Sequence, residues 1–273
     1  MQRHSVSEIL QSTTVRIETF ANDREGLVST GLIYEFRSEE NTYPFLVTTR
    51  HSIDGAGNGR ITLVPEDRGR PALGKGYTLD IDNFEQLWHR HPDEAVDLAV
   101  TPFVPFVRHV EESGIPVFFN SLNEQSLWQP GAGPEPSPLE EVVFVGYPSG
   151  ISDARHMLPV LSRGITATPL GVDYRGERHL VINGPLYPGC SGSPVFLLDK
   201  GAEADDASGE TVRLLGCMTS GYDRAPGKSG RGLRPLGELF DDEDSLPGDF
   251  AGVLRASLFV DLIQAYLKEK GFI

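Results

Sequence analysis

Short apolar segments bounded by turn residues recur along the chain. They are rich in Val, Ile, Leu, Phe, Tyr and Thr, most are flanked by Gly, Pro, Asn or Asp, and few amphipathic helical windows lie between them. The segments cover residues 13–20, 30–36, 44–50, 60–65, 77–81, 97–103, 141–147, 179–183, 193–198, 212–221 and 250–256. This pattern is typical of a mainly antiparallel all-β protein, a barrel or a sandwich, rather than of alternating βαβ units.

One helical pattern occupies the C-terminal end, over residues 257–273. Ser257 is a candidate N-cap, Gly271 is a candidate stop, and the apolar positions fall on one face: Leu258, Leu262, Ile263, Tyr266 and Leu267. We expect this helix to pack on the surface of the strands. A second, shorter helix is predicted within residues 105–114, ending at Gly114.

A segment dense in Gly and Pro, residues 128–141, shows no apolar periodicity and predicts the connection between two halves. The chain then divides into an N-terminal half (1–127), a C-terminal half (142–256) and the terminal helix (257–273). Two further segments, 199–211 and 223–250, have the composition of surface insertions that tolerate change.

Composition narrows the classes of function. With a formal net charge of −15 and no run rich in Lys or Arg, the chain is expected to repel nucleic acid and anionic lipid. No stretch approaches the roughly 20 apolar residues of a membrane-spanning helix, and the polar start lacks a secretory signal. Cys190 and Cys217 are too few for a disulfide framework. We therefore expect no nucleic-acid or membrane partner, two reduced cysteines and a cytoplasmic location.

The stretch YPGCSGSP, residues 187–194, places a cysteine beside a serine among glycines and prolines. A reactive serine hydroxyl needs a base that takes its proton and donors that hold the oxyanion. Gly189 allows backbone N–H groups to turn toward a carbonyl beside Ser191. Of the seven histidines, only His51 directly follows a β-rich segment. Asp97 has apolar flanks, which indicates a partly buried carboxylate that needs a partner such as an imidazole N–H.

Three motifs, VTTRH (47–51), DLAV (97–100) and GCSGSP (189–194), occur in the order His, Asp, Ser. Together they resemble the catalytic motifs of trypsin-like serine peptidases of the chymotrypsin fold. The separations, 46 residues from His51 to Asp97 and 94 from Asp97 to Ser191, are close to those of that family. VFVGYPSG with the later SRGITA is similar to the strand pair that opens the second barrel in bacterial members of HtrA/Deg type. No PDZ-like domain is expected to follow.

The resemblance implies two six-stranded antiparallel β-barrels followed by the C-terminal helix, with His51 and Asp97 on the first barrel and Ser191 on the second. It implies that Ser191 attacks the peptide carbonyl, that His51 acts as general base and then as general acid, and that Asp97 fixes the imidazole tautomer. The backbone amides of Gly189 and Ser191 would form the oxyanion hole. Such a mechanism requires no metal and no organic cofactor.

Cys190 departs from the family pattern. Zymogen-derived relatives carry an aspartate there, which pairs with a newly cut N-terminus, so no such switch is expected in this chain. Cys190 is also a competing nucleophile, but cysteine relatives place the thiol directly before the glycine, where Ser191 stands here. Cys190 is therefore expected to be an inert, buried thiol, because thiolate reactivity needs a specific electropositive setting.

Three other patterns in the sequence have simpler explanations than a functional site. An α/β-hydrolase elbow requires Gly-x-Ser-x-Gly before a helix, and position 193 is Ser. His89, His91 and Asp93 suggest a metal site, but no third histidine lies at matching spacing and a solvated loop explains them. The acidic run 241–249 lacks the glycine and glutamate placement of a calcium-binding hand. No metal site is expected.

The resemblance also places the pocket for the side chain that precedes the cut. In the family its base lies some six positions before the serine, where this chain has Pro185 and Leu186 but no carboxylate, which disfavours Lys or Arg. Met218 is expected to line the opposite wall. Thr219, Ser220 and Gly221 are expected to pair, as a strand edge, with the substrate backbone. The expected preference is for a small or medium apolar residue.

The function expected from the sequence is a serine endopeptidase that acts on polypeptides. The first alternative is a catalytically silent relative that binds peptides or proteins through its cleft or its acidic insertions, and the second is a β-rich structural module with the three motif residues far apart. Because a long loop beside a cleft can cover it, residues 199–211 and 223–250 are where a regulatory partner or a restraint on activity is expected.

Overall fold

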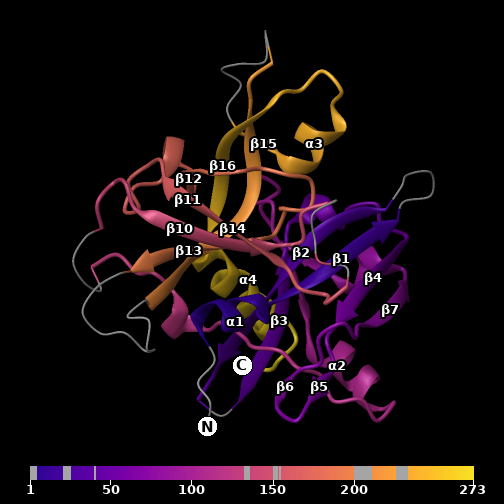
Figure 1. Cartoon of the computed structure of the whole chain (residues 1–273). Helices are drawn as coiled ribbons and strands as arrows, with labels where there is room; N and C mark the ends of the chain where they lie inside the picture. The colour runs from indigo at the N-terminus through magenta and orange to yellow at the C-terminus, as the bar shows by residue number, and fades with distance from the viewer. Residues whose placement is uncertain are drawn as a thin grey trace.

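The computed structural model describes residues 5–20, 26–39, 41–131, 136–149, 153, 155–199, 211–225 and 233–273. Strands dominate these residues and form two large sheets (Figure 1). The first sheet is indigo to purple in the figure and the second runs from magenta to yellow. The central strands of the first sheet are buried on both faces, since Leu32 and Tyr34 belong to one apolar cluster and Ile33 and Leu46 to another.

The first sheet has the strand order β7-β4-β1-β2-β3-β9-β8 and is antiparallel throughout. Its strands are β1 (Thr14–Phe20), β2 (Leu27–Arg37), β3 (Thr42–Thr48), β4 (Asn58–Leu63), β7 (Tyr77–Asp82), β8 (His89–Arg90) and β9 (Ala99–Pro102). A separate hairpin consists of β5 (Glu66–Asp67) and β6 (Arg70–Pro71).

The second sheet has the order β13-β10-β11-β12-β16-β14-β15. Its strands are β10 (Glu141–Gly146), β11 (Val160–Thr166), β12 (His179–Asn183), β13 (Pro194–Asp199), β14 (Thr211–Asp223), β15 (Leu233–Pro235) and β16 (Pro247–Arg255). Because β13 pairs with both β10 and β14, six strands close into a barrel, and β15 adds a seventh strand outside that ring.

The predicted chymotrypsin-like double barrel is confirmed by this arrangement. Among the described residues the strand pairings close the second ring alone, and the first sheet is an open sheet of seven strands. The first sheet ends at Pro102, before the predicted connection 128–141, and the second begins at Glu141, the last residue of that connection, of which residues 132–135 lie outside the described part. Residues 200–210 and 226–232, within the two expected insertions, also lie outside it.

The C-terminal helix α4 (Ser257–Glu269) packs between the two sheets (Figure 1). Its buried residues are Leu258, Phe259, Leu262, Ile263 and Leu267. Aromatic rings of the first sheet meet this helix edge to face, with centroid distances of 6.4 Å for Tyr34 and Phe259 and 5.4 Å for Phe45 and Tyr266. The expected N-cap is wrong: Ala256 is the N-cap, and Ser257 is the first helical residue. Gly271, at φ 72°, follows the helix end as predicted.

Shorter helices complete the described chain. The predicted second helix is α2 (Val104–Glu111), which is followed by Gly114 at φ 77°. Two helices were not predicted, α1 (Val6–Gln11) and α3 (Leu236–Asp241). Four 3₁₀ turns are described: η1 (Arg50–Ser52), η2 (Phe84–Leu87), η3 (Glu124–Ser126) and η4 (Tyr174–Gly176).

The expectation that residues 223–250 form a surface insertion is wrong for its central part. Strand β15 and helix α3 lie here, and the side chains of Leu236 and Leu239 are each only 1% exposed. Asp223, at the end of β14, is also buried. Two apolar side chains of this segment therefore pack against an apolar cluster of the second barrel instead of facing solvent.

Candidate active site

His51 and Asp97 lie at the ends of two neighbouring strands of the first sheet. His51 is in η1, directly after β3, and Asp97 stands two positions before β9. Since Thr48 of β3 pairs with Ala99 of β9, the two ends meet. The Asp97 carboxylate accepts two hydrogen bonds from His51, from Nδ1 to Oδ2 at 2.6 Å and from the backbone N–H to Oδ1 at 2.9 Å. The imidazole is thus held at two points.

The Asp97 carboxylate is strongly favoured in its ionised form. Burial raises the pKa of this carboxyl, but the hydrogen bonds and charge of His51, together with the Arg50 guanidinium, outweigh burial and lower that pKa below its ordinary value. A carboxylate that stays charged keeps the proton of His51 on Nδ1. Nε2 of the neutral ring is then an acceptor.

Ser191 comes from the second sheet and meets this imidazole. Its Oγ lies 2.9 Å from Nε2 of His51, so the three side chains form one hydrogen-bonded chain from Asp97 to Ser191. The Ser191 residue is 6% exposed, and the His51 side chain is 18% exposed. The structure therefore brings together the three residues that the motifs single out, from positions up to 140 residues apart.

A tight turn presents Ser191. The Cys190 N–H donates to the Tyr187 carbonyl at 3.1 Å, and Pro188 and Gly189 occupy the central positions. Gly189 has φ 94°, which suits the third position of a type II turn. Within the described part of the chain, neither the Gly189 nor the Ser191 amide donates a hydrogen bond, so both are available to an acceptor that approaches the hydroxyl.

Two glycines, one within this turn and one directly after Ser191, cannot be replaced without a clash. A Cβ at Gly189 would lie 2.3 Å from the carbonyl oxygen of Tyr147, and one at Gly192, which has φ 82°, would lie 2.0 Å from that of Thr30. Both positions have a positive φ and face backbone that cannot swing aside. The close approach lets the turn sit directly against both sheets.

Thr30 of β2 ties the turn to the first sheet, and the sequence gives no sign of this role. Its N–H donates to the Ser191 carbonyl at 2.9 Å. Its Oγ1 donates to the Gly189 carbonyl at 3.1 Å and accepts from the Tyr147 N–H at 3.1 Å and from Ser193 Oγ at 3.3 Å. One buried threonine thus fixes the backbone on both sides of Cys190.

The two cysteines are free and buried. Burial raises the pKa of the Cys190 thiol to about 11, despite an opposing hydrogen bond at Tyr187, and burial also raises the pKa of Cys217 well above its ordinary value. A thiol that stays protonated near neutral pH is a poor nucleophile. The burial of the two cysteines and the raised pKa of each thiol agree with the interpretation of Cys190 as an inert side chain.

Residues 30–202 match the family model described as the trypsin-like peptidase domain. The chain belongs to the trypsin-like peptidase family. No curated protein sequence matches it.

Two solved structures of similar fold are both proteases. One is the HtrA-type protease AlgW with a tripeptide, with a TM-score of 0.53, 16% identity, and coverage of 97% of this chain and 63% of that one. The other is the serine endoprotease from Yersinia pestis, with a TM-score of 0.52, 13% identity, and coverage of 99% and 69%. This peptidase-family chain thus spans less than two thirds of the AlgW chain. At these identities the likeness is one of fold.

Most of the residues predicted to line the substrate pocket are already packed against other side chains of the chain. Leu186 and Met218 belong to one apolar cluster, together with Leu236 and Leu239 of α3, and Pro185 is half-buried outside that cluster. Gly221 lies against the same leucines, since a Cβ there would be 2.7 Å from Leu239.

The predicted strand edge is also occupied. Ser220 and Gly221 pair with β15, and Thr219 is only 1% exposed. The structure thus fills the expected pocket and covers the expected edge.

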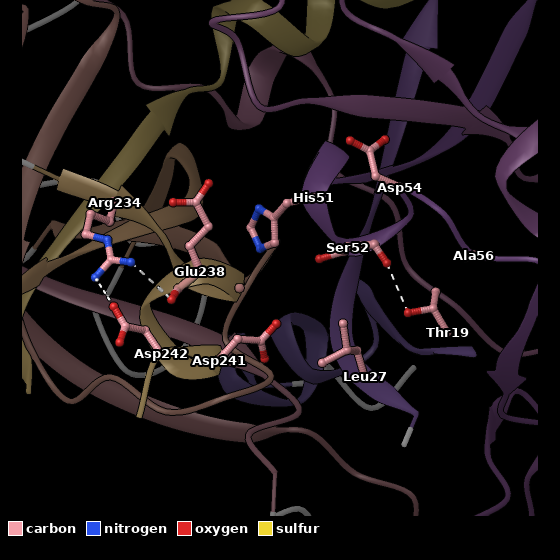
Figure 2. A pocket seen from close by; sticks show the side chains of 11 residues that line it. Thr19, Leu27, His51, Ser52, Asp54, Ala56, Arg234, Glu238, Asp241 and Asp242 are labelled. Atoms are coloured by element: carbon pink, nitrogen blue, oxygen red, sulfur yellow. Dashed lines mark hydrogen bonds and ion pairs between the residues drawn. The ribbon is translucent and has the colours of Figure 1, made fainter. Parts of the chain in front are cut away.

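A cavity of about 460 Å³ opens beside His51 (Figure 2). Figure 2 shows Arg234 and Glu238 on one side of the imidazole and Ser52 and Asp54 on the other. The sequence did not lead us to expect residues of β15 and α3 in the walls of this cavity. A weak sequence signal for α3 exists, because Leu236, Leu239 and Phe240 follow a helical spacing directly after a proline.

The described residues contain no group of three or more His, Cys, Asp or Glu side chains that could hold a metal ion. His91 and Asp93 instead make local contacts, since the Asp93 N–H donates to Nδ1 of His91 at 3.1 Å. Within the same residues, no helix is both long and apolar enough to cross a membrane.

Proposed function

We propose that this chain is a serine endopeptidase that hydrolyses peptide bonds through Ser191, His51 and Asp97. The observation that carries the proposal is the continuous chain of hydrogen bonds from the Asp97 carboxylate through the imidazole to the Ser191 hydroxyl, with lengths of 2.6 and 2.9 Å. Membership of the trypsin-like peptidase family supports it. Each member has a separate role in the reaction.

In the first half-reaction, Ser191 Oγ attacks the carbonyl carbon of the substrate while Nε2 of His51 takes the hydroxyl proton. The imidazolium that forms is stabilised by Asp97, which stays ionised. The tetrahedral intermediate collapses, the imidazolium gives its proton to the leaving amine, and an acyl-enzyme remains on Ser191. In the second half-reaction, His51 activates a water molecule that releases the acid and restores the hydroxyl.

The oxyanion of each tetrahedral intermediate is expected to lie against the amides of Gly189 and Ser191. Two preorganised N–H groups without another acceptor stabilise developing negative charge more in the transition state than in the ground state. The positive φ of Gly189 supports this role, because it sets the direction of the peptide on its N-terminal side.

The test is labelling by a serine-directed fluorophosphonate, read by intact mass and peptide mapping. We expect one adduct, on Ser191, which is absent in Ser191→Ala and falls below about 1% of the wild-type rate in His51→Ala, because the nucleophile then lacks its base. His91→Ala is the matched control, since His91 lies in a loop of the first sheet outside the hydrogen-bonded chain. An adduct on another residue would favour a silent peptide-binding protein. So would a folded chain that stays unlabelled both in wild type and in Leu236→Ser with Leu239→Ser, which loosens the segment 233–241 that lies against His51.

A further inference from the structure

Strand β15 occupies the edge on which a substrate backbone is expected to pair. The second half of β14 pairs with β16 on one side and with β15 on the other. The register on the β15 side joins Ser220 to Pro235 and Gly221 to Arg234, in antiparallel orientation. An extended peptide that adds to a sheet edge uses these same backbone groups. A substrate and β15 therefore cannot occupy this edge together.

Helix α3 fills the apolar pocket at the end of this edge. Leu236 directly follows β15, and Leu236 and Leu239 are both 1% exposed. They pack in one cluster with Leu186 and Met218, two of the residues predicted to line the pocket for the side chain that precedes the cut. The chain itself thus supplies a leucine where the substrate side chain is expected.

The next residue reaches the candidate catalytic base. A Cβ at Gly237 would lie 2.9 Å from Cδ2 of His51, so the first turn of α3 lies directly against the imidazole. Leu236 and Gly237 are helical, so the peptide bond between them turns away from the extended path that begins in β15. The segment enters the site as a substrate would and then leaves it as a helix.

An ion pair anchors the segment. Arg234 Nη1 donates to Asp223 Oδ2 at 2.7 Å and to Ser245 Oγ at 2.8 Å. Asp223 also accepts from the N–H groups of Ala225, at 2.9 Å, and Leu246, at 3.1 Å. Although burial raises the Asp223 pKa, these bonds lower it far below its ordinary value, so the anchor stays charged at any mildly acidic pH.

The covered edge has a polar mismatch. Thr219 Oγ1 and Ser220 Oγ are buried, and the described part of the chain offers neither of them a hydrogen-bond partner. Buried hydroxyls without a partner destabilise the arrangement that buries them. Ser220 Oγ lies near Leu233 of the segment, since a Cβ at Gly252 would be 2.1 Å from the first atom and 2.7 Å from Cδ1 of the second, so the segment leaves this hydroxyl without a partner, as expected of an occupant that a better one can displace.

We propose that residues 233–241 are a built-in competitor that holds the peptidase latent, and that its Leu236 marks the side chain preferred before the cut, one of leucine size. This inference rests on the proposed function. Because the competitor is part of the chain, its effective concentration at the site is high and independent of dilution. The apparent affinity for substrate is then the intrinsic affinity multiplied by the fraction of molecules in which the segment is released.

The test compares fluorophosphonate labelling rates at Ser191 in wild type, in a double variant, Leu236→Ser with Leu239→Ser, and in Leu246→Ser. The two leucines are buried, whereas Leu246 is 54% exposed in the same loop, which makes it the matched control. We expect the double variant to label at least about tenfold faster than wild type, since it removes the cost of opening, and Leu246→Ser to label at the wild-type rate.

A peptide added in trans tests occupancy directly. The peptide LRPLGELFD, residues 233–241, at about 1 mM should slow labelling of the double variant toward the wild-type rate. The same peptide with Leu236→Asp should have no effect, because the pocket would bury its charge. Inhibition by the natural peptide, together with no inhibition by the Leu236→Asp peptide, supports both the competitor and the leucine-sized pocket.

Three results separate the two proposals. Equal labelling of Ser191 in wild type and the double variant overturns the competitor and leaves the peptidase function intact. Absence of labelling in both folded proteins overturns the function, and the competitor with it. Should circular dichroism show that the double variant is unfolded, Arg234→Gln, which keeps both leucines and breaks the anchor, gives the same comparison.

Discussion

The two sheets contribute to the candidate active site in different ways. The first sheet builds its part alone: His51 and Asp97 lie at the ends of β3 and β9, and both hydrogen bonds between them stay within that sheet. The second sheet holds Ser191 on a turn whose carbonyls at Gly189 and Ser191 are bonded by Thr30 of the first sheet. The pairing of His51 with Asp97 is therefore a local property of one sheet, whereas Ser191 is placed by the contact between the two.

The segment that covers the site is held differently from both His51–Asp97 and Ser191. The segment 233–241 that covers the edge is held within the second sheet, through β14 and the Arg234–Asp223 ion pair. The hydrogen-bonded chain is complete while this segment is in place. The alignment of His51 with Ser191 and the placement of the segment thus depend on different contacts, so a change that releases the segment need not disturb that alignment.

The largest effect is expected from the part that the first sheet builds alone. In Asp97→Asn, the amide cannot accept from both the backbone N–H and Nδ1 of His51, so the imidazole takes the tautomer with its proton on Nε2. That proton faces Ser191, and His51 can no longer act as base. We expect turnover of a peptide substrate by the released double variant to fall about 10⁴-fold.

Glu94→Gln is the control for this change, because it removes a carboxylate from an exposed residue three positions away. The crystal structure of the Asp97→Asn protein should show an unchanged backbone at Ser191. A loss of less than about tenfold would mean that the orientation of His51 does not depend on this carboxylate, and would break the view of the first sheet as a self-sufficient acid–base unit.

A smaller effect is expected at the contact between the sheets. Thr30→Val keeps the shape of the side chain but removes the hydroxyl that bonds the Gly189 carbonyl and the Tyr147 N–H. The buried Tyr147 N–H then lacks a partner, at a cost of roughly 1–3 kcal/mol. If the turn shifts to relieve this, kcat should fall by about 10- to 100-fold.

Rescue distinguishes positioning from stability. Thr30→Ser retains the hydroxyl and should restore kcat. Ser29→Ala is the matched control on the same strand, because Ser29 is buried but its Oγ has no hydrogen-bond partner among the described residues. A Thr30→Val protein of normal kcat and lower melting temperature would show that Thr30 stabilises the interface without placing Ser191.

The same difference between the sheets decides what could be predicted from the sequence. His51, Asp97 and Ser191 stand in motifs whose order and spacing are visible in the chain, and their strands have clear apolar patterns. Thr30 could not be found, because its partner Gly189 is 159 residues away and a threonine in a strand has no distinguishing neighbours. Strand β11 was visible only through the family resemblance, since most of its side chains are half-buried or exposed.

The segment 233–241 was missed for another reason. It lies between Gly-rich and acidic stretches, and its helix has only six residues, so composition favoured a surface loop. What decided its structure was tertiary contact, since Leu236 and Leu239 fill a cluster made by residues of other strands. Local pattern alone is weak evidence for an element this short.

The smallest effect is expected inside the second sheet, one residue from the nucleophile. Cys190→Ala removes a buried thiol that is not part of the hydrogen bonds from Asp97 to Ser191, and whose pKa is raised to about 11. We expect fluorophosphonate labelling and turnover within about twofold of the parent protein, and a loss of about 1 kcal/mol in the free energy of unfolding from lost apolar burial. Urea denaturation measures this free energy of unfolding.

Alkylation of the native protein tests the same cysteine without a substitution. Native protein treated with iodoacetamide at pH 8 should keep its activity, because a thiol with this pKa is almost fully protonated there and is also shielded from the reagent. Inactivation that is prevented by Cys190→Ala would make the thiol, and with it the second sheet's own turn, part of the chemistry rather than only its support.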